Sequence, residues 1–254
     1  MRYHPVFEPL VLCMAVAGLW GMAPAAAAQD EQDSEEFTAE FPVAACKLRA
    51  NGRNAYFSLQ PGYQLYLSNA GCSDCDELEE VWITVTHDFR RVLFEADGQP
   101  LTVWTRVVEE RELVDGEIAE VSRNFFARCK GAGDIYYFGE DVDNYEDGEI
   151  ADHEGSWIAG ENGALPGIIM PGGAFLLGSR YFTEVAPGIA LDRAEHVGAG
   201  EEITVPAGTF DDCVVVEDSD ALEPEAEPDE KVYCPGVGLV KDEDLELIAI
   251  YGRF

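Results

Sequence analysis

Basic residues are scarce in this sequence. Of its 254 residues, 16 are Lys or Arg and 50 are Asp or Glu, so the formal net charge at pH 7 is −34. A surface that binds nucleic-acid phosphates needs clustered cations, and the only adjacent cations here are Arg90 and Arg91. We therefore expect neither a nucleic-acid partner nor charge-driven attachment to anionic lipid.

Long apolar runs are also missing after the N-terminus, which excludes a transmembrane anchor in the processed chain. The one long apolar stretch, residues 10–22, follows Arg2 and precedes four alanines at positions 25–28, the pattern of a secretory signal peptide. Residues 1–28 are therefore predicted to be a signal peptide, and the acid-rich residues 29–40 a disordered leader. Residues 41–254 are predicted to form a single β domain, secreted or periplasmic.

Helix signals are weak. No window of 15 residues carries an apolar stripe of helical period, and 25 Gly with 13 Pro argue against long helices, although residues 184–193 could supply one helical turn. The segment 161–178 is rich in Gly and Pro and is interpreted as a packed cover over one end of the domain.

Strand and turn signals are strong. Asp-Gly pairs at positions 97–98, 115–116 and 147–148 lie between segments rich in Val, Thr and aromatic residues, a strong local indication of β-hairpins. The sequence predicts an all-β fold of roughly ten to twelve antiparallel strands, a meander that curls into an open or closed barrel with few short helices. The expected strands are residues 81–86, 101–107, 120–126, 135–138, 189–197, 203–205, 213–216, 231–234, 238–240 and 245–251.

Six cysteines follow the signal peptide, and in an exported protein they are expected to form disulfides. If Cys213 faces Cys234 on antiparallel strands, Glu217 meets Glu230, and repulsion between these acids should end the pairing and open an acidic loop. Cys72 and Cys75 form a C-x-x-C motif, predicted to be a local disulfide, with a redox pair or half of a zinc site as alternatives. Cys46 with Cys129 then follows only by elimination.

The acidic stretch 141–154 raises the alternative of a calcium site. On the calcium-loop template Asp143 takes position 1 and Glu154 position 12, but position 3 is Tyr145 and the flanking segments are typical of strands rather than helices. A hairpin whose acids face water is the favoured interpretation, and a different kind of calcium site is kept as an alternative. Its ligands would be Asp141, Asp143, Asp147 and Glu154.

Signals of catalysis are absent or weak. The three histidines after the signal peptide, His87, His153 and His196, are far apart in sequence and form no metal-ligand spacing. Neither G-x-S-x-G nor G-x-G-x-x-G occurs. An unrecognised hydrolase is kept as an alternative, and no catalytic residue is assigned.

Several short segments together carry a resemblance, in their order and spacing, from about Tyr56 to the C-terminus. The chain resembles a family of exported bacterial β-rich proteins of unestablished function, with distant, fold-level similarity to the curved sheets of envelope proteins, including open barrels that carry lipoproteins. The family implies no catalytic assignment. The segments are residues 56–62, 136–141, 155–160, 166–171, 205–210 and 233–240.

The hypothesis favoured by these observations is an exported, non-enzymatic β-protein. It would bind an unknown small molecule or an envelope protein, either through the barrel interior or through Tyr136, Tyr137 and Trp157 near one rim. No cofactor is expected apart from calcium in the alternative above.

Overall fold

The computed structural model describes residues 37–254, so the predicted signal peptide and residues 29–36 lie outside the described part. The described chain is all-β: one antiparallel sheet of 16 strands and a single 3-10 turn, η1 (Val43–Ala45). No helix in this part is long and apolar enough to cross a membrane. The predicted fold class is confirmed, but there are more strands than expected because several span only two to four residues.

The strands follow one another along most of the sheet. The last strand in sequence pairs with β2, so the N-terminal and C-terminal halves form one continuous sheet. The strands are β1 (Leu48–Arg49), β2 (Gln64–Ser68), β3 (Glu79–Ala96), β4 (Gln99–Val114), β5 (Glu117–Cys129), β6 (Ile135–Glu146), β7 (Glu149–Asp152), β8 (Trp157–Ile158), β9 (Leu165–Met170), β10 (Arg180–Phe182), β11 (Glu184–Val185), β12 (Asp192–Val205), β13 (Gly208–Asp220), β14 (Asp229–Cys234), β15 (Gly238–Asp242) and β16 (Leu245–Tyr251).

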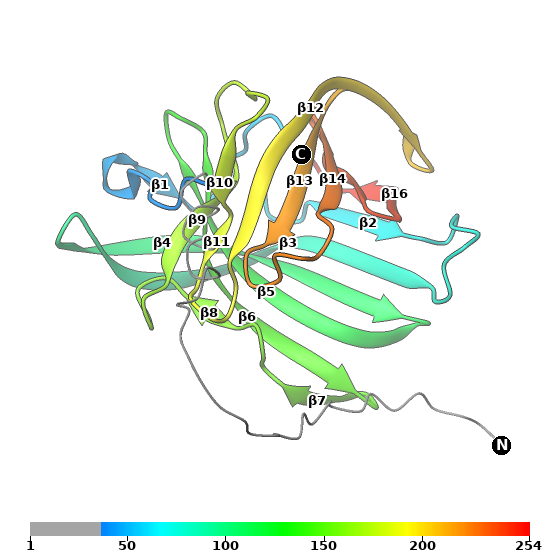
Figure 1. Cartoon of the computed structure of the whole chain (residues 1–254), viewed down its shortest axis with the longest axis horizontal. Coiled ribbons are helices and arrows are strands. Elements are labelled where there is room, and N and C mark those ends of the chain that lie inside the picture. Colours follow the sequence, from blue (N-terminus) through cyan, green and yellow to red (C-terminus); the bar gives the residue numbers. More distant parts are fainter. Residues whose placement is uncertain (1–36) are drawn as a thin grey trace, which may run out of the picture.

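The sheet curls into a nearly closed barrel. Its order runs β10-β12-β13-β14-β15-β16-β2-β3-β4-β5-β6-β9-β11, and the two free ends meet where β10 contacts β9 and β11 contacts β12. In Figure 1 the yellow and orange strands β12–β14 run across the cyan and green strands β2–β6. The interior between these two groups of strands contains the candidate site.

The three predicted hairpins form at the Asp-Gly pairs. Asp97, Asp115 and Asp147 each have φ of +52°, and the glycine after each also has a positive φ, which gives the two left-handed residues of a type I′ turn. These turns connect β3 to β4, β4 to β5 and β6 to β7.

Two local predictions near the barrel seam are wrong. Residues 184–193 form no helical turn, because Glu184 and Val185 pair with β9 and β12 begins at Asp192. The segment 161–178 is not only a cover, because it contains β9, a strand of the barrel wall that pairs with β6. Gly167 shows why a small residue is needed in this wall, since a Cβ there would lie 2.1 Å from the carbonyl oxygen of Thr183.

Residues 37–40, which the sequence assigned to the disordered leader, contact the barrel. The backbone N–H of Phe182 donates to the carbonyl of Thr38 at 2.9 Å. The ring of Phe37 lies 6.1 Å from that of Phe182, and Arg193 lies over it. Residues 37–40 therefore pack against the barrel.

All three predicted disulfides form: Cys46–Cys129, Cys72–Cys75 and Cys213–Cys234. Glu217 pairs with Glu230 as the predicted register requires, but the ladder continues for one more pair, Asp218 with Asp229. The ammonium of Lys241 lies 3.9 Å from the Glu230 carboxylate and compensates for part of the repulsion that was expected to end the ladder, and the ammonium of Lys231 lies 3.3 Å from Asp218 in the added pair.

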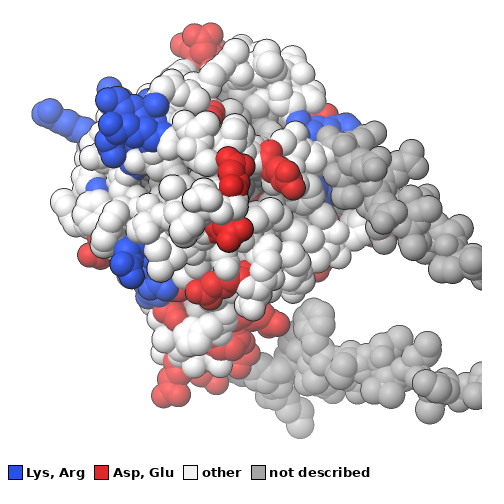
Figure 2. All heavy atoms as spheres, turned by 90° about the vertical axis from the view of Figure 1, so that its left-hand side faces the viewer, with Lys and Arg blue, Asp and Glu red and all other residues white. Residues whose placement is uncertain are grey.

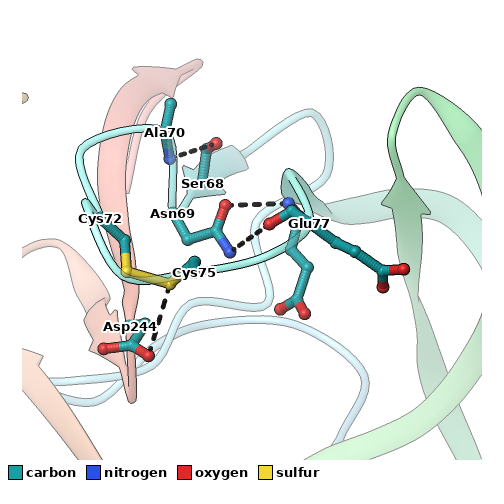
Figure 3. Close-up of a disulfide and its surroundings, with 8 residues drawn as sticks. Ser68, Asn69, Ala70, Cys72, Cys75, Glu77 and Asp244 are labelled. Carbon is teal, nitrogen blue, oxygen red and sulfur yellow. Dashed lines mark hydrogen bonds between the residues drawn. A yellow bond between two sulfur atoms is a disulfide. The ribbon is translucent and has the colours of Figure 1, made fainter.

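The Cys72–Cys75 disulfide closes a short loop between β2 and β3 (Figure 3). The Asn69 side chain braces this loop by donating to the carbonyl of Glu77 and accepting from the N–H of Glu79. Cys72, Cys75 and Asp244 are the only group of three potential metal ligands within 4.8 Å of one another in residues 37–254. Because the two sulfur atoms are bonded to each other, neither is a thiolate that could bind zinc.

Candidate ligand-binding cavity

The barrel interior contains a cavity of about 270 Å³. A second pocket of about 210 Å³ adjoins it, and both are lined by Glu110, Glu112, Leu239 and Asp242. One part of the wall is apolar and includes Tyr63, Leu65, Val85, Val108 and Phe126. The other part carries eight carboxyl groups: Glu110, Glu112, Glu120, Glu140, Glu184, Asp192, Asp218 and Asp242.

Strand register brings these carboxyl groups together. Glu112 of β4 lies opposite Glu120 of β5, and directly opposite residues in an antiparallel pair point to the same face of the sheet. Glu110 lies two residues before Glu112, and Glu140 of β6 lies opposite Asn124, so their side chains enter the same interior. Carboxyl groups from three adjacent strands therefore line one wall.

Lys231 is the only cation that lines the cavity within the described chain. Its ammonium lies 3.3 Å from an Asp218 carboxylate oxygen and 3.7 Å from one of Asp242. Burial alone would lower the pKa of Lys231, but these two carboxylates outweigh it and raise that pKa well above its ordinary value. The lysine stays charged and compensates two of the eight acids.

Glu110 and Glu112 have no ion-pair partner within residues 37–254. Burial raises the pKa of Glu110 to about 8, with Glu112 contributing further, and raises that of Glu112 to about 7, with Glu120 contributing; the charge of Lys231 opposes both shifts but does not cancel them. Glu110 is half-buried and faces the cavity. No hydrogen bond to its carboxyl occurs within residues 37–254.

A hydrogen-bonded network forms another part of the polar wall. The indole Nε1–H of Trp157 donates to Glu184 at 2.6 Å. Burial, together with Glu140 and Asp192, holds the pKa of Glu184 well above its ordinary range and favours its protonated form beside Asp192. The hydroxyl of Tyr137 contacts the side-chain oxygen of Asn124. This part of the wall is already satisfied by its own residues.

The three aromatic residues expected at a rim do not form one group. Tyr137 and Trp157 lie together, with ring centroids 5.3 Å apart, and Tyr137 lines the cavity. Tyr136 faces the opposite side of β6, where it packs against Phe41, because successive residues of a strand point to opposite faces. All three are at most 4% exposed, so they are core residues and not a rim.

The acidic stretch around the third hairpin does not gather its four carboxylates. Asp143 accepts from Arg123 at 2.8 Å and lies 2.9 Å from the His153 ring, while Asp141 lies 3.7 Å from Arg90. Asp147 is in the tight turn, and Glu154 follows β7. No set of three carboxylates within residues 37–254 lies within ligand distance, so the calcium alternative stays a prediction.

The three histidines do not converge either. His196 is buried, stacks on Phe175 with 3.6 Å between ring centroids, and its Nε2 lies 2.9 Å from the Tyr181 hydroxyl. Burial lowers its pKa. His87 and His153 are exposed. No three histidines lie within ligand distance of one another in residues 37–254.

Sequence reasoning missed the acidic wall. In a strand over residues 107–114, Glu110 and Glu112 lie on one face, and Glu109 and Arg111 lie on the other. Both faces therefore carry charge. Such a pattern does not reveal which face is interior. The sequence offered one usable signal: the charged residues 109–112 directly follow residues 101–108, which are largely apolar.

The outer surface distributes charge differently from the interior. On the face shown in Figure 2, most Lys and Arg side chains gather at the upper left, and Asp and Glu side chains lie in the centre and lower part. The few cations of the chain are thus mostly on the outside, and the interior acids have Lys231 alone among the cavity-lining residues of the described chain.

No protein family, curated protein or solved structure matches this chain. The resemblance to exported envelope proteins therefore receives no support from relatives. The cavity is the feature of the described residues that points to a function.

Proposed function

We propose that this chain is an exported, non-enzymatic binding protein that holds a small ligand inside its barrel. The observation that carries the proposal is the cavity of about 270 Å³, with an apolar wall facing a polar one. Small-molecule sites are concave, largely apolar and equipped with a few polar groups that orient the ligand. With the adjoining pocket of about 210 Å³, the space suits a molecule of one or two rings.

Export is supported by two features. The N-terminal pattern is typical of a signal peptide. Three disulfides are characteristic of chains that mature in an oxidising compartment, such as the periplasm or the exterior.

A neutral fluorescent amine of low basicity with two rings, 1-aminonaphthalene, tests the proposal because its emission depends on the polarity of its surroundings. We expect saturable binding of one probe per chain. Leu239→Trp, which fills space where the two pockets meet, should weaken binding by about tenfold or more. The matched control is Leu93→Trp, on an outer position that is 56% exposed. Equal binding by both variants, or no saturable binding, would contradict the proposal.

A hydrolase is the second candidate, and one observation favours it. Carboxyl groups with a pKa raised to about 7 or 8, such as Glu112 and Glu110, also occur as catalytic acids. A screen with esterase, phosphatase and glycosidase substrates tests this candidate. Turnover that Glu110→Gln abolishes and that Glu117→Gln, an exposed control, retains would establish it.

A further inference from the structure

We infer that the ligand of the barrel is an organic cation, an ammonium or guanidinium group attached to a small apolar body. The inference rests on the proposed function and adds the chemical class of the ligand. It is carried by the charge of the cavity wall, by the unpartnered carboxyl of Glu110 and by the position of the apolar wall.

The polar wall of the cavity is acidic. Eight carboxyl groups line the cavity, and Lys231 is the only cation among its lining residues in the described chain. That lysine is already held between Asp218 and Asp242. Carboxyl groups in an interior repel one another, and neighbours disfavour ionisation of each. A cation that enters the cavity relieves this repulsion, whereas an anion increases it.

Glu110 provides an observation that does not depend on the number of acids. Its half-buried side chain lines both pockets, and its carboxyl has no hydrogen-bond or ion-pair partner in residues 37–254. A carboxylate that faces an enclosed cavity is solvated less well than one on the outer surface, so a hydrogen-bond donor beside it contributes more. The position of Glu110 at the junction of the pockets is where a ligand's N–H donors would supply the missing hydrogen bonds.

The apolar wall defines the rest of the ligand. Tyr63, Val108 and Phe126 line the same cavity as Glu110, so a molecule can place a ring or short alkyl chain on them while its charged group reaches the acids. Cations bind aromatic faces as well as carboxylates. A fully solvated inorganic cation would leave this wall in contact with water.

An organic cation fits better than a bound metal ion. Hard metal ions such as Ca²⁺ need several oxygen ligands at about 2.3–2.6 Å. No three carboxyl groups of the described residues bring their oxygens within 4.8 Å of one another. An ammonium group needs only one or two acceptors and tolerates longer separations.

Calorimetry at pH 8 with three ligands of one skeleton tests the inference. The ligands are 2-phenylethylamine, which is cationic, 2-phenylethanol, which is neutral, and phenylacetate, which is anionic. We expect the amine to bind at least about tenfold more tightly than the alcohol, and phenylacetate to bind least, since only the amine brings a positive charge to the carboxyl groups. Lowering the pH to 5.5 should weaken binding of the amine and leave binding of the alcohol unchanged.

Variants separate this inference from the proposed function. Glu110→Gln and, independently, Glu112→Gln should weaken binding of 2-phenylethylamine about tenfold more than they weaken binding of 1-aminonaphthalene. Glu117→Gln, exposed on β5, is the control. Equal affinities for amine and alcohol, or an amine that fails to displace the bound probe, would contradict the inference of a cationic ligand. Neither result would contradict the proposed binding cavity. Absence of probe binding would instead remove the proposed function. Calcium displacing the amine would also overturn the inference in favour of a metal site.

Discussion

Replacing Glu110 by glutamine should stabilise the protein at alkaline pH. The amide side chain keeps the size of the original one but cannot ionise. The pKa of Glu110 rises from an ordinary 4.5 to about 8 on folding, because burial disfavours its charged form. The folded state therefore prefers the protonated carboxyl, and this preference is fully present below pH 4.5. It is lost progressively as the pH rises toward 8, where the unfolded chain carries a charge that the folded chain resists.

The magnitude follows from the two pKa values. Each pH unit between them corresponds to about 1.4 kcal/mol, so ionised Glu110 destabilises the folded state by at most about 5 kcal/mol. Water in the cavity screens the charge of Glu110 and reduces this limit, and we expect about 2–3 kcal/mol. For a domain of this size that corresponds to a rise in melting temperature of roughly 4–12 °C.

The assay is thermal unfolding of the wild type and of Glu110→Gln at pH 5 and at pH 8.5, with Glu117→Gln as a control on an exposed residue. The two curves should nearly coincide at pH 5 and separate at pH 8.5, with the glutamine variant the more stable. The control should follow the wild type at both values. A glutamine variant equally or less stable than the wild type at pH 8.5 would refute the reasoning, since Glu110 would then not be an uncompensated interior acid.

Three further predictions concern the frame of the barrel and the acidic hairpin. Gly139→Ala should cost more than about 3 kcal/mol in urea unfolding, because its Cβ would lie 2.2 Å from the Trp157 carbonyl oxygen, whereas Gly131→Ala, with a similar positive φ but open space, should cost about 1 kcal/mol. Similar losses for both would show that the close contact is unimportant. Replacing Cys213 and Cys234 by Ala should lower the free energy of unfolding by about 3 kcal/mol, since the bridge closes a loop with a sequence separation of 21; an unchanged denaturation midpoint would contradict this. Millimolar calcium should shift the melting temperature by less than about 1 °C relative to chelator, and a larger rise that Asp147→Asn removes would establish the calcium alternative.

Local chemistry could be predicted from the sequence because it acts over a few residues. An Asp-Gly pair favours the two left-handed conformations of a type I′ turn, and all three such pairs in this chain adopt them, so the three hairpins and their connected strands follow directly. The Cys213–Cys234 pairing follows for a similar reason, since the same strand register places Val214 opposite Tyr233 and Val215 opposite Val232. Repulsion between Glu217 and Glu230 was expected to end the ladder but does not, because Lys241, which is distant in sequence, lies 3.9 Å from Glu230.

What the tertiary structure decided is which face of each strand is enclosed. Glu110 and Glu112 become interior residues only because β12–β15 cross in front of β4 and β5, and a strand with charge on both faces cannot encode that by its own period. The same holds for Tyr136 and Tyr137, which are adjacent in sequence but separated by the sheet. Closure of the barrel depends on pairs such as Glu184 with Pro166 and Ser68 with Glu246, whose members are brought together by the curvature of the whole sheet. Sequence thus determined the turns, the disulfides and the β class, and long-range pairing determined the acidic cavity, because enclosure is a property of many strands together.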